Sequence, residues 1–277
     1  MSYANLDGVK ICYEIHGDGE PLLMVHGFGS KKEGHIAQTR PLSSHFKVII
    51  FDNRGAGKSD RPPGPYSMND YAQDMANLMD YLNLKSAYIL GTSLGGMIVQ
   101  HFAINFPERV KKLVVINTTP YLPLDKSGLK LYKKNQIEAY YSKLKDPEKV
   151  FFDGLRTNYS RNFAKILREN PEEKIHGLFS ARDLIENTIV DCSTPKDINN
   201  QIEAIRSHNT LEDLHKIKVP TLILCASHDR LLPKSMSMKM HEKIPNSKII
   251  EIVGTRHNSE KEKAPIVNRH IIDFLNN

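Results

Sequence analysis

The sequence of 277 residues contains no tryptophan and only three cysteines. Cys12, Cys192 and Cys225 lie far apart and show none of the short spacings that are typical of metal ligands. We therefore expect neither a disulfide framework nor a metal site. Cys225 stands in an apolar segment and is expected to behave as a small buried hydrophobic residue. This use of cysteine is typical of a reducing, cytoplasmic environment.

Long apolar segments are also missing. No run is long enough to span a bilayer, and the first residues lack the basic and then apolar pattern of a secretory signal. The sequence therefore predicts a cytoplasmic protein with no membrane partner.

Blocks of like charge are absent as well. The 38 Lys and Arg residues exceed the 32 Asp and Glu residues by a net charge of +6, and this excess is dispersed along the chain. Because no nucleic-acid motif accompanies it, the pattern indicates a solvated surface and no nucleic-acid partner. There is no internal repeat, and the length suits one large α/β domain, with or without an insertion. Either a monomer or a homodimer is compatible with the sequence.

Short apolar runs are present and alternate with helix-like segments. The first run, residues 9–15, alternates in the manner of a hairpin strand. The other strand-like runs are 21–25, 47–51, 87–90, 113–116, 220–225 and 248–253. Helix-like segments follow several of them, at 97–103, 234–244 and 264–275, and residues 67–70 form a capping box that begins another helix. Such alternation predicts a parallel sheet with helices on both faces.

The alternation is interrupted between residues 121 and 210. This segment is charged, poor in strand-like runs and punctuated by prolines, and its apolar residues recur at helical spacing. We interpret residues 1–120 and 211–277 as the core domain and residues 121–210 as a helical cap. A few of the cap aromatics should line a substrate pocket; the candidates are Tyr121, Tyr132, Tyr140, Tyr141, Phe151, Phe152 and Phe179.

A Gly-x-Ser-x-Gly motif occupies residues 91–95, between the strand-like run 87–90 and the helix-like run 97–103. In this context the motif is typical of a nucleophile elbow, a sharp turn that lifts the serine hydroxyl clear of the sheet. The two glycines are required where strand and helix approach closely, and the helix N-terminus favours negative charge. We therefore predict that Ser93 is a catalytic nucleophile.

A serine hydroxyl needs a base that removes its proton and an acid that orients the base. In parallel sheets, functional groups gather beyond the carboxyl ends of the strands. Asp229 and His257 each follow a predicted strand, so we predict His257 as the base and Asp229 as its orienting acid. Asn117 occupies a comparable position but carries no charge, and Asp125 lies further into the cap, so both are poorer candidates for the acid.

Residues 26–29 (His-Gly-Phe-Gly) follow another predicted strand and are suited to an oxyanion hole. We expect one donor to be the backbone N–H of Leu94, directly after the nucleophile, and the second to be that of Phe28. The ring of Phe28 would then form a wall of the acyl pocket. His26 is expected to brace this loop by hydrogen bonding, with no catalytic role.

Residues 52–60 superficially resemble a phosphate-binding loop. They lack the required spacing of glycine and lysine and are not followed directly by a helix. We therefore interpret them as a structural turn, in which Asp52 and Arg54 are expected to pair, and we expect no nucleotide or other cofactor.

Taken together, the motifs at 26–29, 52–59, 91–97 and 229–233, with His257, resemble those of the α/β-hydrolase superfamily. The resemblance covers nearly the whole chain apart from about 121–210. It implies a mostly parallel eight-stranded sheet flanked by helices, with a helical cap insertion. Within the superfamily, residues 62–67 and 92–97 resemble the branch of 3-oxoadipate enol-lactonases and small carboxylesterases.

The serine at position 93 disfavours haloalkane dehalogenases and epoxide hydrolases, which have aspartate as the nucleophile in this superfamily. The resemblance therefore implies a cofactor-free serine hydrolase whose partner is a small-molecule ester of small to medium size. Four alternatives remain open on the same fold. They are an enol-lactonase, a hydrolase of C–C bonds, a perhydrolase and a non-catalytic ligand receptor.

Overall fold

The computed structural model describes residues 1–277 and contains one eight-stranded sheet. Its strand order is β1-β2-β4-β3-β5-β6-β7-β8. The strands are β1 (Ser2–Leu6), β2 (Val9–His16), β3 (Pro21–Val25), β4 (Lys47–Phe51), β5 (Ala87–Thr92), β6 (Val110–Ile116), β7 (Thr221–Ala226) and β8 (Ser247–Ile252). The predicted α/β fold with a mostly parallel sheet is confirmed.

The strand pairing places all functional loops at one edge of the sheet. β1 pairs with β2, and β2 with β4, in antiparallel fashion, whereas every pair from β4 to β8 is parallel. Because parallel strands share their direction, the loops that follow β3, β5, β7 and β8 emerge together.

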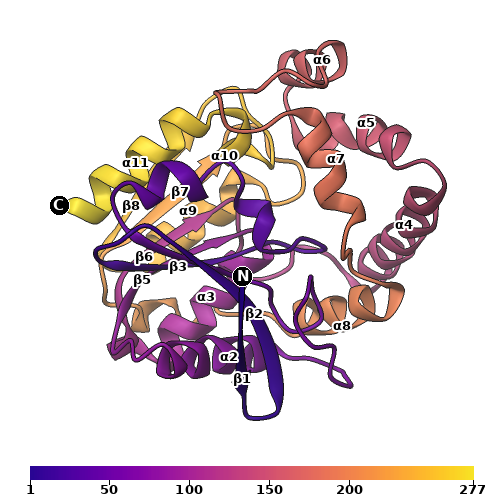
Figure 1. Cartoon of the computed structure of the whole chain (residues 1–277). Helices are drawn as coiled ribbons and strands as arrows, with labels where there is room; N and C mark the ends of the chain where they lie inside the picture. The colour runs from indigo at the N-terminus through magenta and orange to yellow at the C-terminus, as the bar shows by residue number, and fades with distance from the viewer.

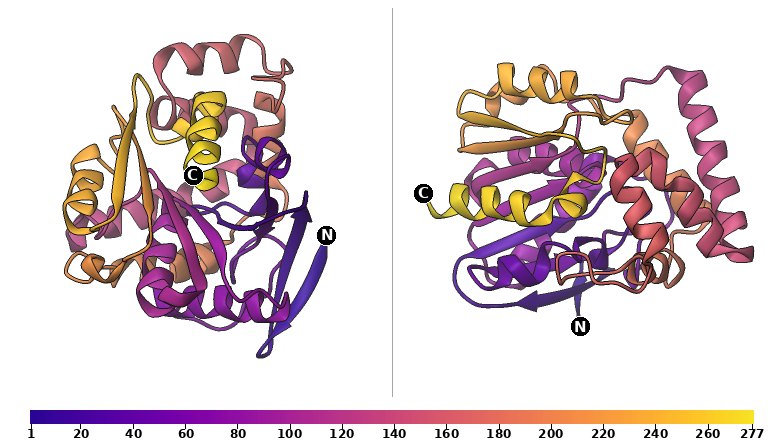
Figure 2. Two further views of the ribbon diagram at one scale, coloured as in Figure 1. Left: turned by 90° about the vertical axis from the view of Figure 1, so that its left-hand side faces the viewer. Right: turned by 90° about the horizontal axis from the view of Figure 1, so that it is seen from above.

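Helices of the core cover both faces of this sheet (Figure 2). α2, α3 and α9 pack on one face, and α1 and α11 pack on the other. Their bounds, with those of the short helix α10, are α1 (Thr39–Ser43), α2 (Met68–Tyr81), α3 (Leu94–Asn105), α9 (Lys234–Lys243), α10 (Ser259–Glu262) and α11 (Ala264–Asn276). The short 3₁₀ helices are η1 (Lys32–His35), η2 (Pro107–Arg109) and η3 (Leu214–Lys216).

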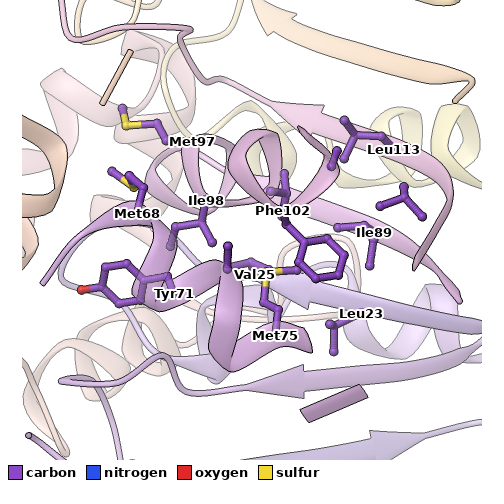
Figure 3. Close-up of a cluster of buried hydrophobic side chains, with 14 of the residues drawn as sticks. Leu23, Val25, Met68, Tyr71, Met75, Ile89, Met97, Ile98, Phe102 and Leu113 are labelled. Carbon is purple, nitrogen blue, oxygen red and sulfur yellow. The ribbon is translucent and has the colours of Figure 1, made fainter. Parts of the chain in front are cut away.

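The larger core cluster fixes the position of α3 on the sheet. Figure 3 shows Ile98 and Phe102 of α3 among Tyr71 and Met75 of α2 and Val25 of β3. Fully burying a side chain of this size contributes about 1.5–3 kcal/mol. α2 itself begins at the predicted capping box, in which the Ser67 hydroxyl accepts from the backbone N–H of the third helical residue. The first residue of α3, directly after Ser93, is thereby held rigidly at the edge of the sheet.

Residues between β6 and η3 form five helices beyond the carboxyl ends of the strands (Figure 1). They are α4 (Lys126–Lys145), α5 (Pro147–Asn158), α6 (Arg161–Glu169), α7 (Ala181–Ile189) and α8 (Pro195–Arg206). An isolated bridge joins Tyr121 to Asn209, and Thr210 donates its N–H to the Pro120 carbonyl. The two ends of this helical segment therefore lie side by side.

None of the helices is both long and apolar enough to cross a membrane.

Candidate active site

Ser93 lies in a sharp turn between β5 and α3. Its backbone has φ +56° and ψ −118°, a strained combination for a residue with a side chain. Two glycines make the turn possible. A Cβ on Gly91 would lie 2.4 Å from the Gly95 carbonyl oxygen, and a Cβ on Gly95 would lie 2.1 Å from that of Val25. The strained serine predicted from the motif is therefore present.

The structure brings Ser93, His257 and Asp229 into one hydrogen-bonded chain. His257 Nε2 lies 3.0 Å from Ser93 Oγ, and His257 Nδ1 lies 2.7 Å from Asp229 Oδ2. Since the carboxylate accepts at Nδ1, the neutral imidazole carries its proton there and leaves Nε2 free to accept the hydroxyl proton. This arrangement can transfer a proton from the serine to the histidine.

The Asp229 carboxylate is held by its own loop. Its Oδ1 accepts the backbone N–H groups of Leu231 and Leu232 at 2.8 and 3.0 Å, while Oδ2 faces His257. The residue is 7% exposed. Hydrogen bonds from backbone N–H groups stabilise the ionised carboxylate in such a buried position.

Asn117, considered above only as a poorer acid candidate, supports the base instead. Its Nδ2 donates to the His257 carbonyl at 2.5 Å and to Ser259 Oγ at 2.8 Å, and its Oδ1 accepts the Ala226 N–H at 2.9 Å. It thus ties the loop after β8 to the end of β7. The position of Asn117 directly after a strand was the signal in the sequence that it lies near the site. The hydrogen-bond partners of its amide depend on the fold and could not be predicted.

The loop after β3 lies directly against Ser93. A Cβ on Gly27 would be 3.3 Å from Ser93 Cβ, which is a tight contact, so glycine eases this approach. The N–H of Phe28 donates to no acceptor in the protein, and that of Leu94, as the first residue of α3, has no partner within the helix. Both residues are thus positioned beside the serine with free N–H groups.

His26 braces this loop as expected. The Asn53 N–H donates to His26 Nε2 at 3.1 Å, so Nδ1 carries the proton and donates to the Gly27 carbonyl at 2.9 Å. Burial lowers the pKa of His26 and keeps the ring neutral.

The expected pairing of Asp52 with Arg54 is wrong. The Arg54 guanidinium makes two 2.6 Å hydrogen bonds to the Asp74 carboxylate of α2. The Asp52 carboxylate instead accepts the backbone N–H groups of Lys32 and Lys58, at 2.7 and 2.9 Å. The two side chains therefore bind different partners, although they are only two residues apart in sequence.

A cavity of about 520 Å³ opens above Ser93 and His257. Phe28 lines it from the core, and its ring contacts that of Tyr132 at a centroid distance of 5.5 Å. Of the other cap aromatics named above, Tyr140 and Phe151 also line the cavity, whereas Tyr141 is 55% exposed. The cap therefore supplies much of the wall around the serine.

A model of the alpha/beta hydrolase fold family matches residues 20–264. The chain belongs to this family. This match confirms the family resemblance that the motifs indicated. The eight-stranded sheet is therefore the sheet of an alpha/beta hydrolase.

Two curated relatives extend over almost the whole of this alpha/beta hydrolase. A protein of Azorhizobium caulinodans, provisionally named as the carbamate hydrolase RutD, is 27% identical, and the alignment covers 99% of this chain and 98% of the relative. A Burkholderia vietnamiensis protein named 2-hydroxy-6-oxononadienedioate/2-hydroxy-6-oxononatrienedioate hydrolase is 25% identical, with coverage of 96% and 91%.

Among solved structures, the enol-lactonase from Burkholderia xenovorans superimposes with a TM-score of 0.83. The superposition covers 100% of both chains at 21% sequence identity. At this identity the likeness establishes the shared alpha/beta hydrolase fold.

Proposed function

We propose that this alpha/beta hydrolase cleaves carboxylic esters of small to medium size, with Ser93, His257 and Asp229 as its catalytic triad. The observation that supports the proposal is the continuous hydrogen-bonded chain from Ser93 Oγ through His257 to Asp229, at the floor of a cavity. No cofactor is needed for this chemistry.

In the proposed mechanism, Ser93 Oγ attacks the ester carbonyl while His257 Nε2 takes the hydroxyl proton. The negative oxygen of the tetrahedral intermediate accepts the N–H groups of Phe28 and Leu94, which are free and adjacent. The alcohol leaves with the proton from His257. A water molecule then attacks the acyl-enzyme with the same base, and the acid is released.

Hydrolysis of p-nitrophenyl esters with acyl chains of increasing length tests this proposal. Ser93→Ala should lower kcat/KM by at least about 1,000-fold, since the nucleophile is lost. Ser30→Ala is the matched control, because Ser30 also lines the cavity but hydrogen-bonds no histidine. Full activity in Ser93→Ala would disprove the proposal, and the chain-length profile of the wild type would define the size of the acyl pocket.

Hydrolysis of other acyl groups is the second candidate, because the two full-length relatives are named for carbamate and C–C substrates. The same serine, base and oxyanion donors would act on a lactone, carbamate or β-diketone carbonyl. A panel of these substrates beside matched esters, at equal concentration, separates the candidates by their kcat/KM values.

A further inference from the structure

The cavity above Ser93 is unusually charged for a site that would receive a neutral ester. Its charged side chains comprise three ammonium groups and two carboxylates; they are Lys31, Lys143, Lys261, Glu33 and Glu260. Ligand pockets are ordinarily lined mainly by apolar groups with a few placed polar ones. The ion-pair partners of each charged side chain therefore show which of these charges are already balanced within the protein.

Both carboxylates have lysine partners. Glu260 Oε1 accepts from Lys261 Nζ at 2.7 Å. Glu33 Oε1 accepts from Lys32 Nζ at 2.5 Å, and its other oxygen lies 4.0 Å from Lys31 Nζ. Lys143 has no carboxylate within 4.0 Å. The positive charge of Lys143 is therefore the one that the cavity leaves without a counter-ion.

Lys31 and Lys143 approach the same point of the cap. Lys31 Nζ donates to the Val190 carbonyl at 2.8 Å, and Lys143 Nζ donates to the Thr188 carbonyl at 3.2 Å. These two carbonyls are two residues apart at the carboxyl end of α7, where the helix dipole favours cations. Because an ammonium group has three donors, each lysine keeps donors for a ligand.

Because Glu33 pairs with Lys32 as well as with Lys31, and Lys143 has no carboxylate partner, this end of the cavity carries an excess of positive charge. Lys31 is only 7% exposed, and burial lowers the pKa of Lys143. Burial therefore disfavours the charged form of Lys143 in the empty cavity. A single negative charge bound between the two ammonium groups would offset this excess.

We infer that the substrate carries one carboxylate, separate from the ester that is cleaved, and that this carboxylate binds between Lys31 and Lys143. The inference rests on the proposed ester hydrolysis and adds the class of substrate, a monoester of a dicarboxylic acid. The residue that selects this class is Lys143, on the cap helix α4.

The test compares monoethyl adipate with ethyl hexanoate, which has the same acyl length and no carboxylate. Ethanol release gives kcat and KM for the wild type, Lys143→Gln and the matched control Lys145→Gln, which removes an exposed charge from the same helix outside the cavity. Lys31 is left unchanged, because its burial would confound binding with folding.

The wild type should prefer the adipate monoester by about tenfold or more in kcat/KM, since charge-assisted hydrogen bonds are worth about 1.5–3 kcal/mol. Lys143→Gln should lose this preference, through a KM that rises about tenfold for the adipate monoester and much less for ethyl hexanoate. Lys145→Gln should retain it. Equal use of both esters, or an equal loss on both in Lys143→Gln, overturns the inference and leaves the proposed esterase intact.

Calorimetric titration with monoethyl adipate separates the inference from the esterase proposal. It uses Ser93→Ala and the double variant Ser93→Ala/Lys143→Gln, neither of which needs to turn over. Binding that weakens by about tenfold in the double variant supports the carboxylate site even if no ester is hydrolysed. Equal binding by the two proteins, or none by Ser93→Ala, overturns it.

Discussion

Ser93 keeps its positive φ because the close packing of its neighbours prevents other backbone conformations. The Gly95 backbone sits against the Val25 carbonyl, and Gly96 sits against the Thr118 side chain, where a Cβ would be 2.5 Å from Thr118 Cβ. The strain at the serine is therefore maintained by close packing of α3 on β3 and the turn after β6. Substitution at these glycines acts on the fold as well as on the site.

Gly95→Ala should destabilise the protein by about 3 kcal/mol, because the new methyl group would collide with a backbone carbonyl that cannot rotate away. Gly154→Ala is the matched control, since a Cβ at this helical glycine of α5 meets no atom within 4 Å. It should stabilise by about 0.5–1 kcal/mol. Urea unfolding measures both, and equal stability of the two variants would contradict the packing argument.

Asn117→Asp should lower kcat by about 10- to 100-fold with little change in KM. The substitution keeps the acceptor for Ala226 but places an oxygen against the His257 carbonyl, so the loop that carries the base shifts. Steady-state kinetics on the best ester measures the effect. Asn246→Asp, which alters an exposed amide bonded to Lys218, serves as the control. An unchanged kcat in Asn117→Asp would show that the loop holds its position alone.

At the residue scale, the candidate triad residues could be named from the sequence because each follows a recognisable strand. Asn117 was named only as a poorer acid, since its role depends on two loops that meet in space. The Arg54–Asp74 pair was missed for the same reason, because the two residues lie on a turn and on α2.

At the scale of elements, two histidines link α3 to the segment that follows α8. His208 Nε2 donates to the Thr119 carbonyl at 2.9 Å, so its Nδ1 is free to accept from His101 Nε2 at 3.1 Å. Burial lowers the pKa of each histidine to about 4. Both rings are therefore neutral in the folded protein near neutral pH, and protonation of His208 at Nδ1 removes the acceptor for His101.

The pair should make the protein less stable in mild acid. The folded pKa of about 4 lies below the unfolded value of 6.5, so the unfolded chain binds protons first. Stability is fully present above pH 6.5 and falls toward pH 4, by on the order of 2 kcal/mol for each histidine between about pH 7.5 and about pH 5. Urea unfolding at both pH values measures the loss.

His208→Gln should show a smaller loss over the same pH interval, because glutamine keeps hydrogen-bonding groups but does not titrate. His215→Gln is the control, since His215 is exposed. An identical pH dependence in the wild type and His208→Gln would assign the acid sensitivity to other groups.

For the helices of the cap, the sequence predicts their presence but not which side of each helix faces the cavity. Helical spacing and the prolines indicated helices between 121 and 210, and helices α4 to α8 lie there. Which of their faces meets the cavity could not be predicted, because α4 is amphipathic only in part and buries a single residue, Leu129. The directions of Tyr132 and Tyr140 follow from contacts with Phe28 and the α8 cluster that no local pattern encodes.

On the scale of the whole molecule, burial is uneven. α3 buries nine of its twelve residues between the sheet and α2, whereas α4 buries one of twenty. A separate apolar cluster in the cap joins the core through Ala37, Ala264 and the partly buried Ile36. Most of the sheet and its covering helices could be predicted because their short apolar runs alternate regularly, whereas β1 and α1 have no such run and were not predicted. The packing of the cap on them depends on contacts between residues far apart in sequence, such as those of Ala204 and Ile205 with the main core cluster.

This gradient predicts unequal local stability. Amides of α4 should exchange with deuterium at least about 100-fold faster than those of α3, because opening α4 exposes little apolar surface. Hydrogen exchange followed by mass spectrometry of peptides covering the two helices measures the ratio. Equal protection of α4 and α3 would show that the cap opens only with global unfolding.

The adjacent ends of the cap have a consequence for how the protein can change in evolution. Because Tyr121 and Asn209 are bridged, the cap leaves and rejoins the core at one place. An exchanged, lengthened or shortened cap needs only to span that gap, and the eight strands and their order stay as they are. The core can thus stay nearly unchanged in evolution while new substrate specificities arise through changes in the cap.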